Sequence, residues 1–302
     1  MEVYRKLLRR VISHPGSARS ILLKFIYKWE DCPSRRTCLR CWCIWWQHKH
    51  RKNKNGAFLM KCSHCNETYS EFRGTILESS KIHISIWCQA LLEWCVCTGS
   101  ISAAELSRRV GISEPSAQRL LRNIRQVCLR SLNTNIVFDD VCELDESWMW
   151  KKENQDIVLG ITQRYTRKLT FICIENAESE IITPIVTSCI QEGSQIHSDN
   201  ASYYCDFKLQ YHHFTTNHSK WEYATLNTHK KSWEVIRVHS NTIEHIWWDF
   251  KGIVRTIHHG ISKKYRKQYL AQYAFRYSCW NNTNLFYAFL ENMLTIPTFR
   301  YW

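Results

Sequence analysis

The chain has 302 residues, enough for two or three small domains or for one small module beside a catalytic domain of ordinary size. Lysine and arginine number 41 against 27 acidic residues, and the net charge of +14 favours a polyanionic partner, with a solvated basic surface as the plain alternative. The 15 cysteines, with no secretory signal, argue against a disulfide framework. No apolar run approaches the roughly 18–20 residues of a membrane helix. We therefore expect a soluble, intracellular protein without a membrane partner, nuclear in a eukaryote and otherwise cytoplasmic.

Composition divides the chain into three regions, which we interpret as domains 30–76, 80–135 and 136–290. The first region is dense in cysteine, tryptophan and basic residues. The second has helical spacing of apolar residues, beginning with a helix expected over Ile82–Cys97. In the third, short apolar strands alternate with helical stretches, which is typical of an α/β domain.

Two C-x-x-C pairs lie in the first region, Cys38 with Cys41 and Cys62 with Cys65. Their inner cysteines are 21 positions apart (62 − 41), a spacing that suits a tetrahedral Zn²⁺ site. Asn55-Gly56 between the pairs indicates the turn of a ribbon hairpin. Four cysteines leave no open coordination position, so the predicted zinc ribbon has a structural role.

The assignment of the four ligands has competitors close by. Cys32, Cys43 or His64 could replace one of them. The plain alternative is two unrelated pairs of buried thiols.

The second region has the start and stop signals of a helix-turn-helix. Ser102 is expected to cap a short helix, with Glu105 completing a capping box, and Gly111 to end that helix. Ser113 is expected to cap the next helix, with Pro115 in its first turn.

The helix after Ser113 is expected to bury one face and to present arginines on the other. The apolar positions are Ala117, Leu120, Leu121 and Ile124. Arg119, Arg122 and Arg125 are expected to project toward DNA, as in a helix that lies in the major groove or against phosphates. An ordinary helical hairpin with a solvated basic face is the alternative.

The third region places acidic residues on predicted strands and on a helix. We expect a strand ending in Glu143, Asp145 and Glu146, and a later strand ending in Asp199. Glu244 lies on a helix that begins after Ser240 and has apolar residues at helical spacing. Such carboxylates can hold two divalent metals for phosphoryl transfer, and Mg²⁺ suits oxygen ligands.

From the residues alone this acidic pattern is weak, because any of the 27 acidic side chains could lie at a strand end. Surface carboxylates without a function are then the simpler interpretation. We also expect a strand over Leu169–Ile174 and a helix over Ile181–Ile190.

Several ordered blocks, over roughly residues 38–280, resemble the Merlin-type transposases of eukaryotic cut-and-paste elements and their bacterial insertion-sequence relatives. The matching blocks are Lys61–Cys65 with Tyr69 and Gly74, Glu143–Ser147, His197–Asp199 with Tyr203 and Tyr204, Asn217–Ser219, His239–Glu244 with Trp247 and Lys251, and Phe275–Tyr277.

The resemblance implies an α/β ribonuclease H-like catalytic domain preceded by a zinc ribbon and a helix-turn-helix. It implies that Asp145, Asp199 and Glu244 bind Mg²⁺ or Mn²⁺, with Asn241 as the reserve third ligand, and that Lys251 contacts DNA. The implied activity is metal-dependent phosphodiester hydrolysis and strand transfer on double-stranded DNA, at terminal inverted repeats and a target. The implied assembly is a homo-oligomer on DNA.

The chain departs from the family pattern after Ser147. The family carries a longer basic, glycine-containing segment there, whereas only Trp148–Asp156 precedes the next expected strand. A shortened loop favours one alternative, a domesticated DNA-binding protein without catalytic activity. A zinc-ribbon transcription or interaction factor, with the third region as a scaffold, is another.

Overall fold

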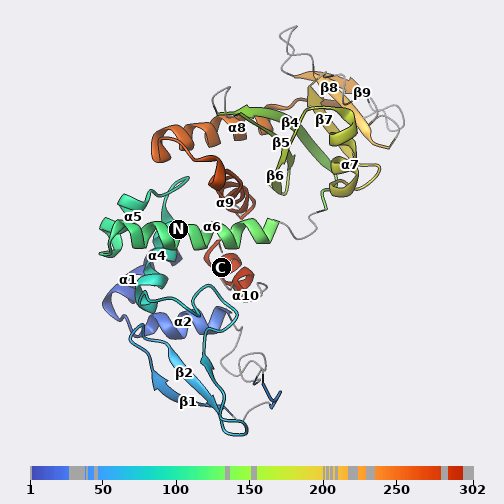
Figure 1. Ribbon diagram of the computed structural model, residues 1–302. Helices are drawn as coiled ribbons and strands as arrows, with labels where there is room; N and C mark the ends of the chain where they lie inside the picture. The colour runs from blue at the N-terminus through green and yellow to red at the C-terminus, as the bar shows by residue number, and fades with distance from the viewer. Residues whose placement is uncertain are drawn as a thin grey trace. The chain divides into compact units, whose positions relative to one another are not determined.

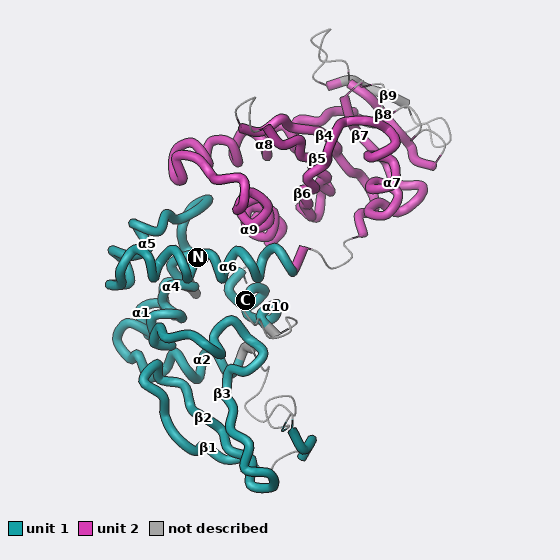
Figure 2. Tube along the Cα trace, viewed as in Figure 1, with its two compact units in different colours: residues 1–130, 282–302 teal, residues 131–281 magenta. Residues whose placement is uncertain are grey.

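A computed structural model divides the chain into two units, residues 1–130 with 282–302, and residues 131–281 (Figure 2). The structure describes residues 2–26, 38, 40–43, 47–132, 137–150, 155–199, 201, 204, 207, 210–216, 224–228, 235–279 and 285–294. Within these ranges no helix is both long enough and apolar enough to span a bilayer. The division falls near the predicted boundary at residue 135, but residues 282–290 belong to the first unit, not to the α/β region.

The first unit contains helices on both sides of a small sheet in sequence (Figure 1). Its elements are α1 (Glu2–Ser13), α2 (Ser17–Ile26), β1 (Gln47–Lys52), β2 (Phe58–Cys62), β3 (Thr68–Ser70), α4 (Ile84–Val96), α5 (Ala103–Val110), α6 (Glu114–Leu132) and α10 (Leu285–Leu294).

The cysteine-rich region forms an antiparallel sheet of order β1-β2-β3. The turn at Asn55-Gly56 joins β1 to β2, and Gly56 has a φ of 86°, a conformation that glycine adopts without strain. Cys62 ends β2 and Cys65 lies in the turn to β3, so the second knuckle is held by a hairpin.

Helix α4 is the centre of the first unit because it is apolar on most sides. Trp87 and Trp94 are buried on it, and α1, α2, α5 and α10 all contact it. Trp94 packs on Phe289 of α10 with ring centroids 5.3 Å apart. Residues near the two ends of the sequence therefore share one core, which the predicted domains did not anticipate.

The second unit is a mixed α/β domain. Its elements are β4 (Val141–Met149), β5 (Asp156–Gln163), β6 (Leu169–Ile174), α7 (Ser179–Cys189), β7 (Gln195–Asp199), β8 (His212–Thr216), β9 (Thr225–Thr228), β10 (Val235–Val238), α8 (Asn241–Ile253), the π-helical turn η4 (Val254–His258), the 3-10 turn η5 (Lys263–Tyr265) and α9 (Arg266–Ser278).

Five of these strands form one sheet of order β6-β5-β4-β7-β8. The pairs β6-β5 and β5-β4 are antiparallel, whereas β4-β7 and β7-β8 are parallel. Strands β9 and β10 form a separate antiparallel pair.

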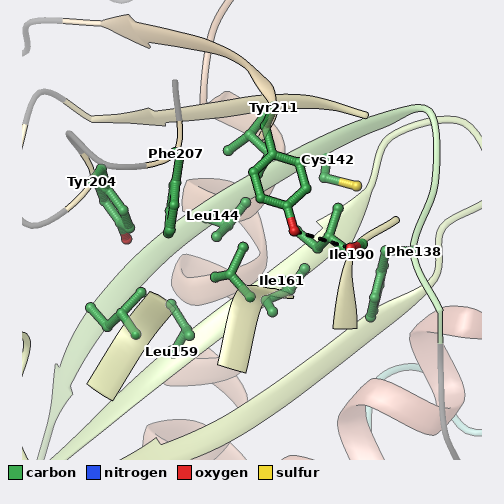
Figure 3. Close-up of a cluster of buried hydrophobic side chains, with 12 residues drawn as sticks. Phe138, Cys142, Leu144, Leu159, Ile161, Ile190, Tyr204, Phe207 and Tyr211 are labelled. Atoms are coloured by element: carbon green, nitrogen blue, oxygen red, sulfur yellow. Dashed lines mark hydrogen bonds between the residues drawn. The ribbon is translucent and has the colours of Figure 1, made fainter. Parts of the chain in front are cut away.

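Helices cover both faces of this sheet, and alternate strand residues decide which face receives which helix. On one face lies a buried cluster that includes Leu144 and Ile161 (Figure 3). Ile182 and Val186 of α7 belong to the same cluster. On the other face α8 and α9 pack through a second cluster, whose members are Met149, Val158, Leu169, Ile243, Ile246, Trp247, Phe250, Leu270, Tyr273 and Ala274. The acidic residues of interest lie on this second face.

The predicted strand over residues 141–147 is longer than expected, because β4 continues to Met149 and pairs with β5 from Cys142 to Met149. Asp145 therefore lies in the middle of a strand, not at its end. Strand β7 ends at Asp199 as predicted, β6 has the predicted bounds, and α7 lies within two residues of its predicted bounds at both ends.

Candidate active site

Two carboxylates occupy matching positions on the neighbouring parallel strands β4 and β7. Glu143 pairs with His197 across these strands. Since side chains alternate along a strand, Asp145 and Asp199, two residues further on, share the same face as that pair. The paired register ends at Glu143 and His197; continued along both strands, it brings to the same edge of the sheet two acids that are 54 positions apart in sequence (199 − 145).

The third predicted carboxylate, Glu244, is on α8, and hydrogen bonds to Glu143 hold the start of α8 against β4. The Glu143 side chain is fully buried and accepts hydrogen bonds from the amides of Thr242 and Ile243 at 2.8 and 3.0 Å. The Thr242 hydroxyl donates to the same carboxylate at 2.7 Å. These amides belong to the first turn of α8, where they have no partner within the helix and carry partial positive charge. The docked turn brings Glu244 to the face that holds Asp145.

Gly160 lets α8 lie close to the sheet. It pairs with Asp145 across β4 and β5. A Cβ at Gly160 would lie 2.6 Å from Cζ2 of Trp247 and 2.9 Å from Cδ1 of Ile243. Any larger residue would therefore push α8 outward, so this glycine sets the separation between the helix and the strand that carries Asp145.

The electrostatics of Asp145 reflect the carboxylates around it. Burial is the main cause that raises the pKa of Asp145, and the charges of Glu146, Asp199 and Glu244 add to it in that order, which brings the pKa to about 8. Asp199 and Glu244 are thus near enough to disfavour a charge on Asp145. Acids gathered in this way repel one another unless a cation lies between them.

The arrangement suits divalent metal ions held by oxygen, with the three carboxylates as the ligands. They do not form a tight group, because among the described residues the sets of ligand atoms within 4.8 Å of one another contain only cysteine and histidine. A wider spread is compatible with two ions, which share their ligands.

Hydrogen bonds orient the acids that flank Asp145. Ser240, the residue before α8, donates from its hydroxyl to Glu244 Oε1 at 2.7 Å. Glu146 lies on the opposite face of β4, where it is buried and accepts a hydrogen bond from the Tyr204 hydroxyl. Glu146 therefore faces the α7 side of the sheet, away from Asp199 and Glu244.

Arg164 forms hydrogen bonds with residues near the three acids in sequence, namely Glu143 on β4, His197 on β7 and His239 before α8. Its Nε donates to Glu143 Oε1 at 2.8 Å and its Nη2 donates to the His239 carbonyl at 3.0 Å. The same Nη2 lies 3.0 Å from Nδ1 of His197. Burial, together with the Arg164 charge, lowers the pKa of His197 to about 3, so His197 is neutral and accepts this hydrogen bond.

The four predicted zinc ligands come together in the first unit. The sulfurs of Cys38 and Cys65 are 3.4 Å apart, and those of Cys41 and Cys62 are 3.6 Å apart. A tetrahedral ion with Zn–S bonds of about 2.3 Å would hold its sulfurs about 3.8 Å apart. The four cysteines therefore form a cluster with the spacing that Zn²⁺ requires.

A second group shares one of these cysteines. Cys41, Cys43 and His64 also have ligand atoms within 4.8 Å of one another. Cys43 and His64, two of the three alternative zinc ligands expected from the sequence, therefore lie close enough to compete for the ion. Cys32 lies outside the described residues.

Helices α5 and α6 are joined by a tight turn, and the predicted caps at Ser102 and Gly111 are present. The predicted capping box is not formed, because Glu105 pairs with arginines, and the Ser113 hydroxyl contacts Ser116 Oγ at 2.9 Å instead of capping α6. Ser102 accepts a hydrogen bond from the Glu105 amide at 3.2 Å, and Gly111 adopts a φ of 69° after α5. The Glu105 carboxylate pairs with Arg108 and Arg109. Helix α6 begins at Glu114, directly after Ser113.

The predicted row of projecting arginines on α6 needs a correction. Arg119 and Arg122 are exposed, but Arg125 is buried with 7% of its surface exposed. Arg125 follows Ile124 and lies four positions after Leu121, both of them buried, so the helical period turns it toward the core. It cannot project into a DNA groove.

The remaining predicted site residues have varied positions. Lys251 is exposed on α8, seven positions after Glu244 and so on the same side of the helix. Asn241 is the first residue of α8 and is exposed. The blocks at Tyr203 and Asn217–Ser219 lie outside the described residues.

Three residues of the cluster, Gly160, Glu143 and Arg164, have roles that the sequence did not predict. Gly160 carried a usable signal, since a glycine inside an apolar strand indicates a close approach of another element. Glu143 shares the period-two face of Asp145, but its role as a helix cap depends on α8, about 100 positions away. Arg164 has no spacing pattern that links it to Glu143.

The second unit resembles one known protein family. Residues 145–278 match the family described as the ISXO2-like transposase domain. Among solved structures, a chain in the cryo-electron microscopy structure of the simian T-cell lymphotropic virus intasome in complex with PP2A regulatory subunit B56 gamma is 12% identical. That match covers 61% of this chain and 66% of the other, with a TM-score of 0.31, too low to support an argument. Comparison with curated proteins finds no significant match.

Proposed function

We propose that this chain, whose residues 145–278 match the ISXO2-like transposase domain family, is an active DNA transposase of the cut-and-paste type. The observation that carries the proposal is the convergence of three acids from distant parts of the sequence. Asp145 and Asp199 take matching positions on β4 and β7, and the charge of Glu244 acts on Asp145 from α8. In this proposal the second unit is a ribonuclease H-like catalytic domain.

The three carboxylates would hold Mg²⁺ or Mn²⁺, which supplies an activated water or 3′-hydroxyl and stabilises the leaving oxygen. Glu143 and Gly160 keep α8 against the sheet, so that Glu244 stays in register with Asp145. Arg164 also donates a hydrogen bond to the Glu143 carboxylate, at 2.8 Å. The protein thereby contributes a pre-positioned set of oxygen ligands that reorganises little during phosphoryl transfer.

DNA recognition would belong to the first unit. The four-cysteine cluster fits Zn²⁺, and α5, the turn at Gly111 and α6 have the order of a helix-turn-helix. Arg119 and Arg122 would contact phosphates from the exposed side of α6. The enzyme would act as a homo-oligomer on double-stranded terminal inverted repeats and a target.

A domesticated, DNA-binding protein without catalytic activity is the second candidate. The short connection between β4 and β5, from Met149 to Asp156, is the observation that favours it, because the family carries a longer segment there.

Nicking of supercoiled plasmid by the full chain tests the choice between the two. We expect nicked product with Mg²⁺ or Mn²⁺ and none with Ca²⁺, and Asp145→Asn or Asp199→Asn should abolish it. Asp139→Asn is the matched control, since Asp139 precedes β4 and pairs with Lys168 at the surface. A nicking activity that survives Asp145→Asn would reject this active site, and a wild-type chain that binds DNA but never nicks it would favour the second candidate.

Metal analysis tests the zinc proposal separately. We expect one zinc per chain, lost in Cys62→Ser with Cys65→Ser and retained in Cys43→Ser. Zinc that is lost in Cys43→Ser would instead assign the ion to the group of Cys41, Cys43 and His64.

A further inference from the structure

A pocket of about 740 Å³ lies beside the end of β4, in the second unit. Three parts of the fold form its walls. These are the end of β4, the last turn of α8, and the π-helical turn η4 with the residues after it. The residues that matter most for its chemistry are Trp148, Met149, Trp150, Phe250, Lys251 and Arg255.

The lining combines aromatic surface with positive charge. Trp148 is 48% exposed, so part of its aromatic surface is open to an occupant of the pocket. Lys251 and Arg255 are both exposed, and neither forms an ion pair with a described residue. An occupant with a flat apolar part and a negative part would satisfy both features.

The wall at η4 is an uncommon piece of backbone. Val254–His258 form a π-helical turn, followed by His259 with a φ of 53° and Gly260 with a φ of 119°. Such turns are rare and occur frequently at functional sites. Arg255, His259 and Gly260 all line the pocket, so the irregular turn helps to shape it.

The pocket lies further along β4 and α8, the two elements that also carry Asp145 and Glu244. Met149 is four residues after Asp145 on one face of β4, a separation of about 13 Å at the rise of a strand. Lys251 is seven residues after Glu244 on one side of α8, about 10 Å along the helix. These separations correspond to about three to four steps of a DNA strand at about 3.4 Å each.

We propose, resting on the function proposed above, that this pocket binds one unstacked nucleotide of the DNA strand about three to four steps from the scissile phosphate. The base lies against Trp148, and its phosphate is held by Lys251 and Arg255. A base inside a duplex cannot enter a pocket, so this nucleotide leaves the stack when the DNA end is engaged. Stacking on an aromatic side chain accepts any base, so the pocket does not select a sequence.

Photocrosslinking locates the occupant without any knowledge of the recognised sequence. The probe is a twelve-nucleotide oligothymidylate with a single 5-iodouracil, irradiated with the full chain in Ca²⁺ so that no strand is cut. We expect the crosslinked peptide to contain Trp148 or Trp150. Trp148→Ala should reduce the crosslink yield about tenfold, as expected for one lost base stack.

A second variant and a matched control keep the test independent of folding. Lys251→Ala leaves the aromatic wall intact and should lower the affinity for the probe. Trp248→Ala removes a tryptophan that is 71% exposed on α8 but does not line the pocket, and it should change nothing. Circular dichroism of each variant verifies the fold.

Crosslinks confined to residues outside the pocket would overturn the proposal, as would unchanged yields in both Trp148→Ala and Lys251→Ala. Plasmid nicking separates this result from the proposed function. Nicking without a crosslink at the pocket would reject only the nucleotide site. A crosslink at Trp148 without any nicking would support the nucleotide site and reject the catalytic proposal.

Discussion

Glu143 joins a strand, a helix and a loop through one buried carboxylate. It accepts hydrogen bonds from two amides and one hydroxyl at the start of α8. It also forms an ion pair with Arg164, whose side chain is 15% exposed. Replacement by glutamine keeps the shape but removes the charge opposite Arg164. Breaking a buried pair from one side leaves an uncompensated charge and costs about 3–5 kcal/mol.

We therefore expect Glu143→Gln to lower the free energy of unfolding by about 3 kcal/mol in urea titrations. Asp139→Asn breaks an exposed pair with Lys168 and should stay within about 0.5 kcal/mol of the wild type, because surface pairs contribute little. Equal stabilities for the two variants would show that the cap at Glu143 is not holding α8.

The Asp145 carboxyl should destabilise the metal-free protein as pH rises. Its pKa is raised from 3.8 to about 8 in the folded chain, so folding favours the protonated form. Stability that is present below about pH 4 is then lost progressively up to about pH 8, where both states are ionised. An asparagine at this position cannot ionise and escapes the loss.

Thermal unfolding in EDTA should show Asp145→Asn and the wild type nearly equal at pH 4 and the variant more stable at pH 8. A difference on the order of 2 kcal/mol is reasonable at pH 8 for a partly exposed group. Millimolar Mg²⁺ should stabilise the wild type and not the variant. A variant that is less stable than the wild type at pH 8 in EDTA would contradict the raised pKa.

The sequence allowed the three acids to be named, because they stand in ordered blocks that resemble a family. Their neighbours were harder to find. The pairing of Arg164 with Glu143 depends on where the β5–β6 turn folds back, and nothing in the local pattern of either residue encodes it. Arg125 was wrongly predicted to be exposed. The spacing of three residues between the arginines was taken as one exposed face, but the buried face of α6 is wide enough to include Arg125.

At the scale of elements, the separation of α8 from the sheet depends on Gly160. A methyl group there would lie 2.6 Å from the Trp247 ring, which is itself stacked on Phe171 with centroids 4.6 Å apart. The ring cannot retreat without losing that stack, so α8 must move. Overpacking of this kind costs about 1–3 kcal/mol.

Gly160→Ala should therefore lower the free energy of unfolding by about 1–3 kcal/mol and also reduce plasmid nicking, because Glu244 moves away from Asp145. Gly252→Ala is the matched control. Gly252 lies on α8, where an added Cβ would meet no atom within 4 Å outside the helix's own backbone, and alanine favours the helix. If the two alanine variants nick DNA equally, the position of α8 does not limit catalysis.

In the second unit β6, β7 and α7 lie close to where the sequence places them, whereas β8, β9, β10 and α9 were not predicted. The N-terminal helices α1 and α2 and the return of α10 to the first unit were not predicted either. Their apolar faces are matched to α4, and a contact between the two ends of a chain leaves no trace in a local pattern.

For the whole molecule, the proposal separates DNA recognition from chemistry. Arg119 and Arg122 are the exposed arginines of α6, in the first unit, and Asp145 lies in the second. Each phosphate contact contributes roughly one to the slope of log affinity against log salt. Replacing both arginines with alanine should lower that slope by about two.

The final prediction is a double dissociation in the full chain, measured by fluorescence anisotropy on duplex DNA and by plasmid nicking. Asp145→Asn should keep the wild-type affinity and salt slope but nick nothing. The Arg119→Ala, Arg122→Ala variant should bind DNA more weakly and with the shallower salt slope, yet at low salt, where its remaining phosphate contacts bind most tightly, it should still nick. Gln118→Ala, an exposed position of α6 next to Arg119, should match the wild type in both assays. A salt slope unchanged in the arginine variant would mean that α6 does not face DNA, because counterion release depends on the number of neutralised phosphates and on nothing else in the helix.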